Sequence, residues 1–240
     1  MAMNNAMTWS IPGLVISCQA SEGSPLRDPY IMVAMARAAE AAGAVGTRVE
    51  GAADIAAVIA ATSIPVIGIR KQHRPGSDVY ITATLDDVDL IADAGATIVA
   101  LDATSRPRPF GQELAEIVAH AHARGLLVMG DLAAADDAPA AIDAGVDAIG
   151  TTLVPASAED GRPGGPNLAV LERLCREYPQ TPVVAEGRYA SPADIIAAFR
   201  AGATTVVVGR AVTDAYALAR DLVSAAQSCV PVTNRQHAHT

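Results

Sequence analysis

The chain has 240 residues, of which 51% are hydrophobic and 3% aromatic, and its formal net charge is -9 at pH 7. That length fits one large domain or two small ones, and the negative charge argues against a general binder of nucleic acid or anionic membranes. The three cysteines have no CxxC spacing, so they predict neither a disulfide framework nor a zinc motif, and a reducing cytoplasm is the simplest setting for them.

The sequence predicts neither a targeting segment nor a membrane-spanning segment. No lysine or arginine precedes Arg27, so we expect no secretory signal peptide. No uninterrupted run of about 18 apolar residues predicts a membrane span. Residues 1–10 and 231–240 have the composition of frayed ends.

Short apolar runs alternate along the chain with longer segments that have apolar residues three and four positions apart, a pattern typical of buried strands followed by amphipathic helices. The eight runs are 14–19, 44–49, 65–71, 97–103, 126–132, 148–153, 182–188 and 205–210. Helix-like segments follow the runs, for example at 28–43, 85–95, 111–125, 167–178 and 191–202.

The helix boundaries have their own signals. Ser191 is the expected N-cap of the segment 191–202, with Pro192 in the first turn and Asp194 at the positive end of the helix. Glycine directly after a helix is typical of a C-cap, and an Ala-Gly pair recurs before a strand. The glycines of these pairs are Gly43, Gly95, Gly145 and Gly202. Their regular spacing fits either a turn that all units share or a fourfold internal repeat.

Eight strand–helix units in a chain of this length predict an α/β fold, a (β/α)8 TIM barrel that forms a single domain over residues 1–240. A doubly wound open sheet is the main alternative, but no GxGxxG motif follows the first run. The connection 73–84 is longer than the others and is a candidate for an extra short strand and for a lid. Residues 155–166 are rich in glycine and proline and are the candidate mobile loop.

Polar residues end almost every run, and in such barrels the active site lies at the C-terminal ends of the strands. In chain order these residues are Ser17, Gln19, Arg48, Arg70, Lys71, Asp102, Asp131, Thr151, Thr152, Glu186, Arg188, Gly209 and Arg210. Solvation or a local salt bridge explains any one of them. A shared site for a polar ligand explains the whole set.

Gly187 and Gly209 follow the last two strands, where many barrels bind a phosphate group on backbone N–H groups and a helix N-terminus. Glycine permits the close approach of backbone and ligand that such binding needs. Glycine is also common in turns between strand and helix. The pattern indicates a phosphorylated small molecule.

Lys71 and Glu186 end the third and seventh runs, which lie on opposite sides of an eight-stranded ring. Two such groups can remove a proton from one face of a ligand and return one to the other, if the lysine is neutral and the glutamic acid protonated. Burial would move the pKa of each group in that direction. The alternative is a Lys71–Glu186 salt bridge, which would move both pKa values the opposite way. The strand ends offer no cluster of histidine and carboxylate, so we predict no metal site.

The chain resembles a known family along nearly its whole length: the N-acetylmannosamine-6-phosphate 2-epimerases of sialic acid breakdown. The resemblance rests on GLVISCQA, AVGTRVEG, PVIGIRK, DVYITAT, IVALDATSRPRP, TTL and VVAEGRYASP, of which SCQA and LDAT followed by RPRP are the specific motifs. It implies a (β/α)8 barrel of the ribulose-phosphate-binding type that is usually dimeric and needs neither a metal nor an organic cofactor.

The resemblance also implies the roles of individual residues. The family's catalytic lysine and glutamate match Lys71 and Glu186, which would act at C2 of the sugar. Gln19, Arg48 and Asp131 match positions that hold the substrate. The backbone around Gly187 and Gly209 would hold the phosphate. The implied partner is a phosphorylated N-acyl amino sugar, handled by a cytoplasmic homodimer that binds neither nucleic acid nor membranes.

The sequence departs from the family pattern in three places. Asp214 stands where the family often has an arginine after the last strand, and Arg210, earlier in the turn, is the candidate to replace that charge. VPAS stands in place of the usual SGYT after the sixth strand. Arg70 replaces a residue that is commonly apolar, and if the strand alternates it points away from Lys71.

Two other functions remain open at this stage. In a Schiff-base lyase or aldolase, Lys71 would be the nucleophile. In a phosphosugar-binding barrel without catalysis, the same strand ends would bind the ligand and not turn it over.

Overall fold

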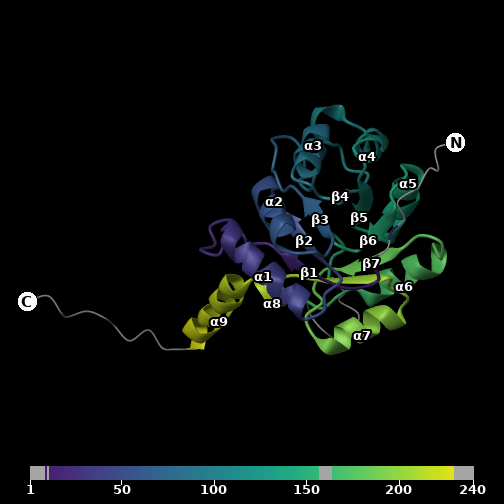
Figure 1. Ribbon diagram of the computed structural model, residues 1–240. Helices are drawn as coiled ribbons and strands as arrows, with labels where there is room; N and C mark the ends of the chain where they lie inside the picture. The colour runs from purple at the N-terminus through teal and green to yellow at the C-terminus, as the bar shows by residue number, and fades with distance from the viewer. Residues whose placement is uncertain (1–8, 10, 157–163, 230–240) are drawn as a thin grey trace, which may run out of the picture.

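The computed structural model describes residues 9, 11–156 and 164–229. Its eight strands form a closed parallel barrel in which each strand pairs with the next along the chain (Figure 1). The strands are β1 (Gly13–Cys18), β2 (Gly46–Glu50), β3 (Val66–Ile69), β4 (Ile98–Asp102), β5 (Leu127–Asp131), β6 (Ala148–Gly150), β7 (Val183–Glu186) and β8 (Thr205–Val208). The predicted (β/α)8 TIM barrel is therefore confirmed.

The first and last strands close the ring. Val15 of β1 is the partner of Val207 of β8, and Ile16 is the partner of Val208. This pairing leaves the sheet without edge strands, so the doubly wound open sheet is wrong. Closure also places the C-terminal ends of all eight strands around one mouth.

Helices cover the outside of the barrel (Figure 1). They are α1 (Pro29–Ala41), α2 (Ala52–Ala61), α3 (Leu85–Asp93), α4 (Leu114–Ala123), α5 (Ala138–Asp143), α6 (Leu168–Glu177), α7 (Pro192–Arg200), α8 (Arg210–Thr213) and α9 (Ala215–Cys229), with 3-10 turns η1 (Pro109–Gly111) and η2 (Ala135–Asp137). None of the helices in the described part of the chain is both long and apolar enough to cross a membrane.

The predicted helix boundaries are confirmed where the sequence carries a cap. Ser191 Oγ accepts a hydrogen bond from the Asp194 N–H, and the Asp194 carboxylate accepts one from the Ser191 N–H, so the two residues form a capping box. The four glycines that follow helices all have positive φ, between 89° and 103°. Only glycine adopts that conformation without a steric penalty, which is the reason for the recurring pair.

The hydrophobic core has two layers. Val15, Ile67 and Met129 belong to the layer inside the barrel. The second layer lies between the strands and the helices and includes Ile55, Ile91 and Val146. At Gly68 an added Cβ would lie only 2.5 Å from Ile91 Cγ2, so α3 packs directly on the backbone of β3.

Two expectations about less regular segments have different outcomes. Within the stretch 1–10, which we predicted to be frayed, Trp9 is instead 7% exposed and its indole N–H lies 3.4 Å from Thr205 Oγ1. A large apolar ring that closes the bottom of the barrel is better buried than exposed. Residues 157–163 of the candidate mobile loop and residues 230–240 lie outside the described residues.

Candidate active site

The C-terminal ends of the strands surround a cavity of about 480 Å³. Six of the predicted site residues line it, and they come from both sides of the barrel: Gln19, Lys71, Glu186, Gly187, Gly209 and Arg210. Arg48 and Asp131, which we also predicted to be site residues, are buried and do not line the cavity. The structure therefore brings most of the predicted residues to one pocket and puts two charged residues deeper in the barrel.

Lys71 is the second residue after β3 and Glu186 ends β7, so the two side chains approach the cavity from opposite strands. Within the described residues, no ion pair joins them. Lys71 is open to solvent on one side, but the protein around it displaces much of its water. This desolvation and the nearby Arg48 cation lower the pKa of Lys71. Burial raises the pKa of Glu186 in spite of the opposing charge of Arg48.

Lys71 is the only lysine of the chain, and arginine makes up the other basic residues. Arginine stays protonated at any ordinary pH, whereas an amine in a desolvated site can lose its proton. A lone lysine at the mouth among so many arginines is therefore a candidate for proton chemistry, and the sequence alone shows that it is the only lysine.

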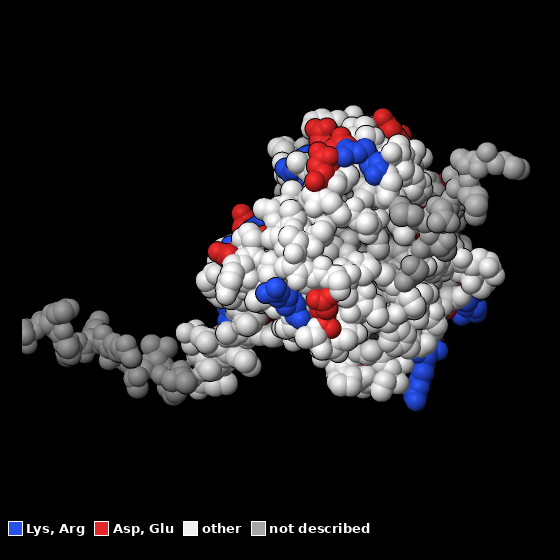
Figure 2. All heavy atoms as spheres, viewed as in Figure 1, with Lys and Arg blue, Asp and Glu red and all other residues white. Residues whose placement is uncertain are grey.

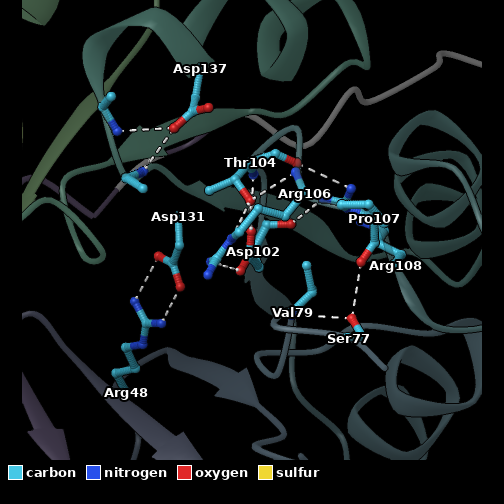
Figure 3. A network of polar contacts seen from close by, with 12 residues as sticks. Arg48, Ser77, Val79, Asp102, Thr104, Arg106, Pro107, Arg108, Asp131 and Asp137 are labelled. Atoms are coloured by element: carbon cyan, nitrogen blue, oxygen red, sulfur yellow. Dashed lines mark hydrogen bonds and ion pairs between the residues drawn. The ribbon is translucent and has the colours of Figure 1, made fainter. Parts of the chain in front are cut away.

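The partner of Glu186 is Arg48 of β2, which is 1% exposed and makes an ion pair with Glu186 Oε2. The same guanidinium donates to both carboxylate oxygens of Asp131, at 3.1 Å and 2.5 Å (Figure 3). Burial alone would lower the pKa of Arg48, but the two carboxylates outweigh it and raise the pKa above its usual range. Arg48 therefore fixes the orientation of Glu186 from beneath the cavity.

Two threonines after β6 support the same network. Thr151 Oγ1 donates to the Glu186 carbonyl at 2.8 Å and accepts a hydrogen bond from the Glu186 N–H at 3.0 Å. Thr152 lines the cavity and its hydroxyl donates to Asp131 Oδ1 at 2.6 Å. The sequence shows both residues at a strand end, but it does not show that they hold the two carboxylates in place.

Gln19, the residue directly after β1, presents a polar group to the cavity. Its amide nitrogen donates to Ser17 Oγ at 2.6 Å, while its buried Oε1 has no hydrogen-bond partner within the part of the chain described. A buried acceptor without a partner is unfavourable, and a ligand that donates a hydrogen bond would satisfy it.

The turn after β7 has an uncommon backbone conformation. Gly187 has φ 103° and Arg188 has φ 66°, an uncommon conformation for a residue with a side chain. Arg188 Nη1 donates to the Val154 carbonyl at 2.8 Å, and Arg188 lines the cavity together with Arg210. No described residue accepts a hydrogen bond from the N–H of Gly187, Arg188 or Gly209. We expected Arg188 at the mouth as one of the polar strand-end residues, but we did not predict a role for it.

Asp214, which departs from the family pattern, has two structural partners. Its Oδ1 accepts from the Ala217 N–H at 3.0 Å, so Asp214 is the N-cap of α9. Its Oδ2 accepts from Ser21 Oγ at 2.8 Å and ties the turn after β1 to the turn after β8. Asp214 also lines the cavity, next to Arg210.

Two other charged residues at strand ends, Asp102 and Arg70, pair with side chains outside the cavity. Asp102 is buried and binds the hydroxyl of Thr104 at 2.7 Å and the guanidinium of Arg106 at 2.5 Å (Figure 3). Arg70 makes an ion pair with Asp87 of α3 at 3.2 Å, whereas Lys71 lines the cavity, which confirms that these neighbours point apart.

No group of histidine, cysteine and carboxylate side chains that could hold a metal ion occurs within residues 9, 11–156 and 164–229. The site is thus formed by one amine, one carboxyl group held by a buried arginine, and a turn of backbone N–H groups beside two arginines. The family model NanE, described as "Putative N-acetylmannosamine-6-phosphate epimerase", matches residues 32–228. The chain belongs to this epimerase family. The resemblance inferred from the motifs is therefore confirmed.

Curated relatives and a solved structure agree with this membership. A protein of Clostridioides difficile strain 630, named "Putative N-acetylmannosamine-6-phosphate 2-epimerase", is 40% identical over 212 residues, which cover 88% of this chain and 95% of the relative. A protein of Klebsiella pneumoniae with the same name is 43% identical over 84% of each chain. The N-acetylmannosamine-6-phosphate 2-epimerase structure from Clostridium perfringens superposes with a TM-score of 0.83 at 32% identity, covering 90% of this chain and 94% of that one.

Proposed function

We propose that this epimerase-family chain interconverts N-acetylmannosamine 6-phosphate and N-acetylglucosamine 6-phosphate by removing and returning a proton at C2. The observation that carries the proposal is the position of Lys71 and Glu186, which line one cavity from opposite strands and are not paired with each other. Their pKa values are shifted in the directions that a proton donor and acceptor near neutral pH require, Lys71 down and Glu186 up.

In the open-chain sugar the carbonyl at C1 makes the C2 proton acidic. The neutral amine of Lys71 takes that proton from one face, and the electron pair of the broken C–H bond forms the C1–C2 double bond of an enolate. The protonated carboxyl of Glu186 then gives its proton to C2 from the other face. In the reverse direction the two groups exchange roles. The Arg48 guanidinium stabilises the carboxylate that Glu186 becomes.

The remaining site residues suit the other parts of such a substrate. We infer that the backbone N–H groups around Gly187 and Gly209 bind the phosphate, assisted by the charge of Arg210 and Arg188. We infer that Gln19 binds a polar group of the sugar through the buried oxygen that has no partner. Arg48 and Asp131 would contribute from beneath the cavity, by way of Thr152 and Glu186.

We also propose a homodimer. Helix α9 extends from the barrel (Figure 1), and Ala217 is the one residue of this helix that is buried. Its exposed apolar side chains are Tyr216, Leu218, Leu222 and Val223, with exposures from 38% to 73%. Apolar surface of this kind is favourably covered by a second protein surface. A cytoplasmic location fits the three cysteines, which are all free.

The deciding experiment follows N-acetylmannosamine 6-phosphate by proton NMR in deuterated buffer. We expect conversion with deuterium at C2, because the returned proton comes from a side chain that exchanges with solvent. Lys71→Ala and Glu186→Gln should each lower kcat by about 10²–10⁴-fold or more while the circular dichroism of the barrel stays unchanged. Glu172→Gln, on the outside of the barrel, is the matched control and should turn over like the wild type.

The two alternatives give different results. Borohydride with substrate would leave a stable adduct on Lys71 only if the reaction passes through a Schiff base. Binding of the sugar phosphate without turnover would support a non-catalytic barrel. Conversion without deuterium at C2, or near-normal rates in either variant, would contradict the proton-transfer mechanism.

A further inference from the structure

The connection between β3 and α3 carries Lys71 as its second residue and is folded back on itself. Lys71 forms an isolated antiparallel bridge with Ile81, and the Gln72 N–H donates to the Tyr80 carbonyl at 2.9 Å. Further along, Arg74 forms a second bridge with Ser77. The backbone that carries the amine is therefore one side of a short hairpin, and its position depends on what holds that hairpin to the barrel.

Arg74 turns back from this hairpin toward the barrel. Its side chain is only 14% exposed, and Nη2 lies 2.8 Å from Asp87 Oδ1 on α3. The same nitrogen donates to Gln72 Oε1 at 3.1 Å. Gln72 is the residue directly after Lys71, so one guanidinium links the neighbour of the amine to a helix of the barrel.

Asp87 is a rigid anchor for this link. It is 1% exposed, and its other oxygen accepts hydrogen bonds from the N–H groups of Ala83 at 3.0 Å and Thr84 at 3.1 Å. The bond from Thr84 is one half of the capping box of α3, and the Asp87 N–H completes it by donating to Thr84 Oγ1 at 3.3 Å. A carboxylate that is hydrogen-bonded to the first turn of a helix has few accessible conformations. An ion pair with this carboxylate therefore restricts the movement of the hairpin.

Two further contacts hold the same segment. Arg70 donates to Gln72 Oε1 at 2.8 Å and lies 3.2 Å from Asp87, but about a third of its side chain is exposed. Ser77 at the tip donates to the Pro107 carbonyl at 3.0 Å (Figure 3). Of the two arginines Arg74 is the more buried, and a buried ion pair is less screened by water than an exposed one.

We propose that Arg74 is a positioning residue for the epimerisation: through Gln72 and Asp87 it holds the segment that carries Lys71, so that the amine stays directed into the cavity. This rests on the proposed function, because Lys71 is the proton-handling group there. A displacement of about 1 Å at a reacting group can reduce the rate of a reaction roughly a hundredfold.

The test compares Arg74→Met, Arg74→Lys and the wild type. We expect kcat of Arg74→Met to fall roughly tenfold to a hundredfold while KM changes little, because Arg74 does not line the cavity. Arg74→Lys keeps a charge that can reach Asp87 and should recover part of the loss. If Arg74→Met does not fold by circular dichroism, Arg74→Gln replaces it.

A second readout does not depend on turnover. Lys71 is the only side-chain amine of the protein, so an amine-acylating reagent and mass spectrometry measure its reactivity across pH without interference from other lysines. In Arg74→Met we expect the pKa of Lys71 to rise toward the ordinary value for lysine, because a loosened hairpin admits water. A hairpin that serves only general stability would leave this pKa unchanged.

Arg124→Met is the matched control. Arg124 also pairs with carboxylates of α3, Asp89 and Asp93, but it is far from the Lys71 hairpin in the chain. Figure 2 shows Lys or Arg side chains beside Asp or Glu side chains over the region of α3 and α4. Its kcat and Lys71 reactivity should match the wild type. Wild-type kcat and wild-type Lys71 pKa in Arg74→Met would overturn the proposal. Absence of epimerisation by the wild type would refute the proposed function instead, and the labelling result would still decide the role of Arg74 in holding Lys71.

Discussion

Replacement of Arg48 by methionine tests the buried charge network directly. The substitution keeps a long apolar side chain and removes the cation that Asp131 and Glu186 share. Asp131 would keep the hydroxyl of Thr152 as a donor but would have no counter-charge in a site that water does not reach. The variant therefore leaves buried carboxylates without a partner, which is among the most unfavourable changes a core can undergo.

The size of the effect follows from the burial of both partners. Breaking a buried ion pair by removal of one member destabilises a protein by about 3–5 kcal/mol, and we expect this range for Arg48→Met at pH 8. The loss depends on pH. Without Arg48 the pKa of Glu186, already raised by burial, rises further above its unfolded value. Stability is then lost as pH rises above the ordinary glutamate pKa of about 4.3, so the loss should shrink toward pH 4.

Urea unfolding followed by tryptophan fluorescence measures these differences. Trp9 is the single tryptophan and is buried against the barrel, so its emission reports loss of the native packing. Asp131→Asn and the double variant with Arg48→Met complete a mutant cycle, in which we expect a coupling energy of about 0.5–3 kcal/mol. The exposed ion pairs of Arg124 offer a control, and Arg124→Met should leave the free energy of unfolding close to the wild-type value.

Two results would refute this reasoning. One is a loss below about 1 kcal/mol for Arg48→Met at pH 8, the size of an exposed pair. The other is an equal loss at pH 4 and pH 8, since protonated carboxyl groups need no counter-charge.

Three further predictions concern the site and its scaffold. The rate should rise with pH as Lys71 loses its proton and fall again as Glu186 loses its own; a flat profile from about pH 5 to 9 would contradict paired proton transfer. Gly68→Ala should destabilise the barrel by about 1–3 kcal/mol in thermal unfolding, because the new methyl group would meet Ile91; an unchanged Tm would contradict the close packing of α3. Asp214→Ala should destabilise by about 1 kcal/mol and speed amide exchange in α9, whereas Asp214→Asn keeps the cap; equal exchange in both variants would rule out capping.

Much of the fold could be predicted because its signals are local. The period of the apolar residues separates strands from helices, Ser191 marks a helix start, and Gly95 marks a helix end, and each depends only on neighbours in the chain. Several of the residues that line the site could also be predicted, because the position of a residue at the end of a strand can be read from the sequence. Once eight parallel strands close into a ring, the last residue of each strand must face one mouth, so Lys71 and Glu186 meet there.

The partners of these residues were decided by the tertiary structure. Glu186 pairs with Arg48 and not with Lys71, and Asp102 turns to Arg106 in its own loop. The sequence left the first choice open because Arg48 and Glu186 are far apart in the chain and meet only when the barrel closes. Local periodicity determines that a side chain reaches the mouth. Which charge it faces depends on the register and direction of strands from distant parts of the chain, and burial then lowers the pKa of Lys71 and raises that of Glu186.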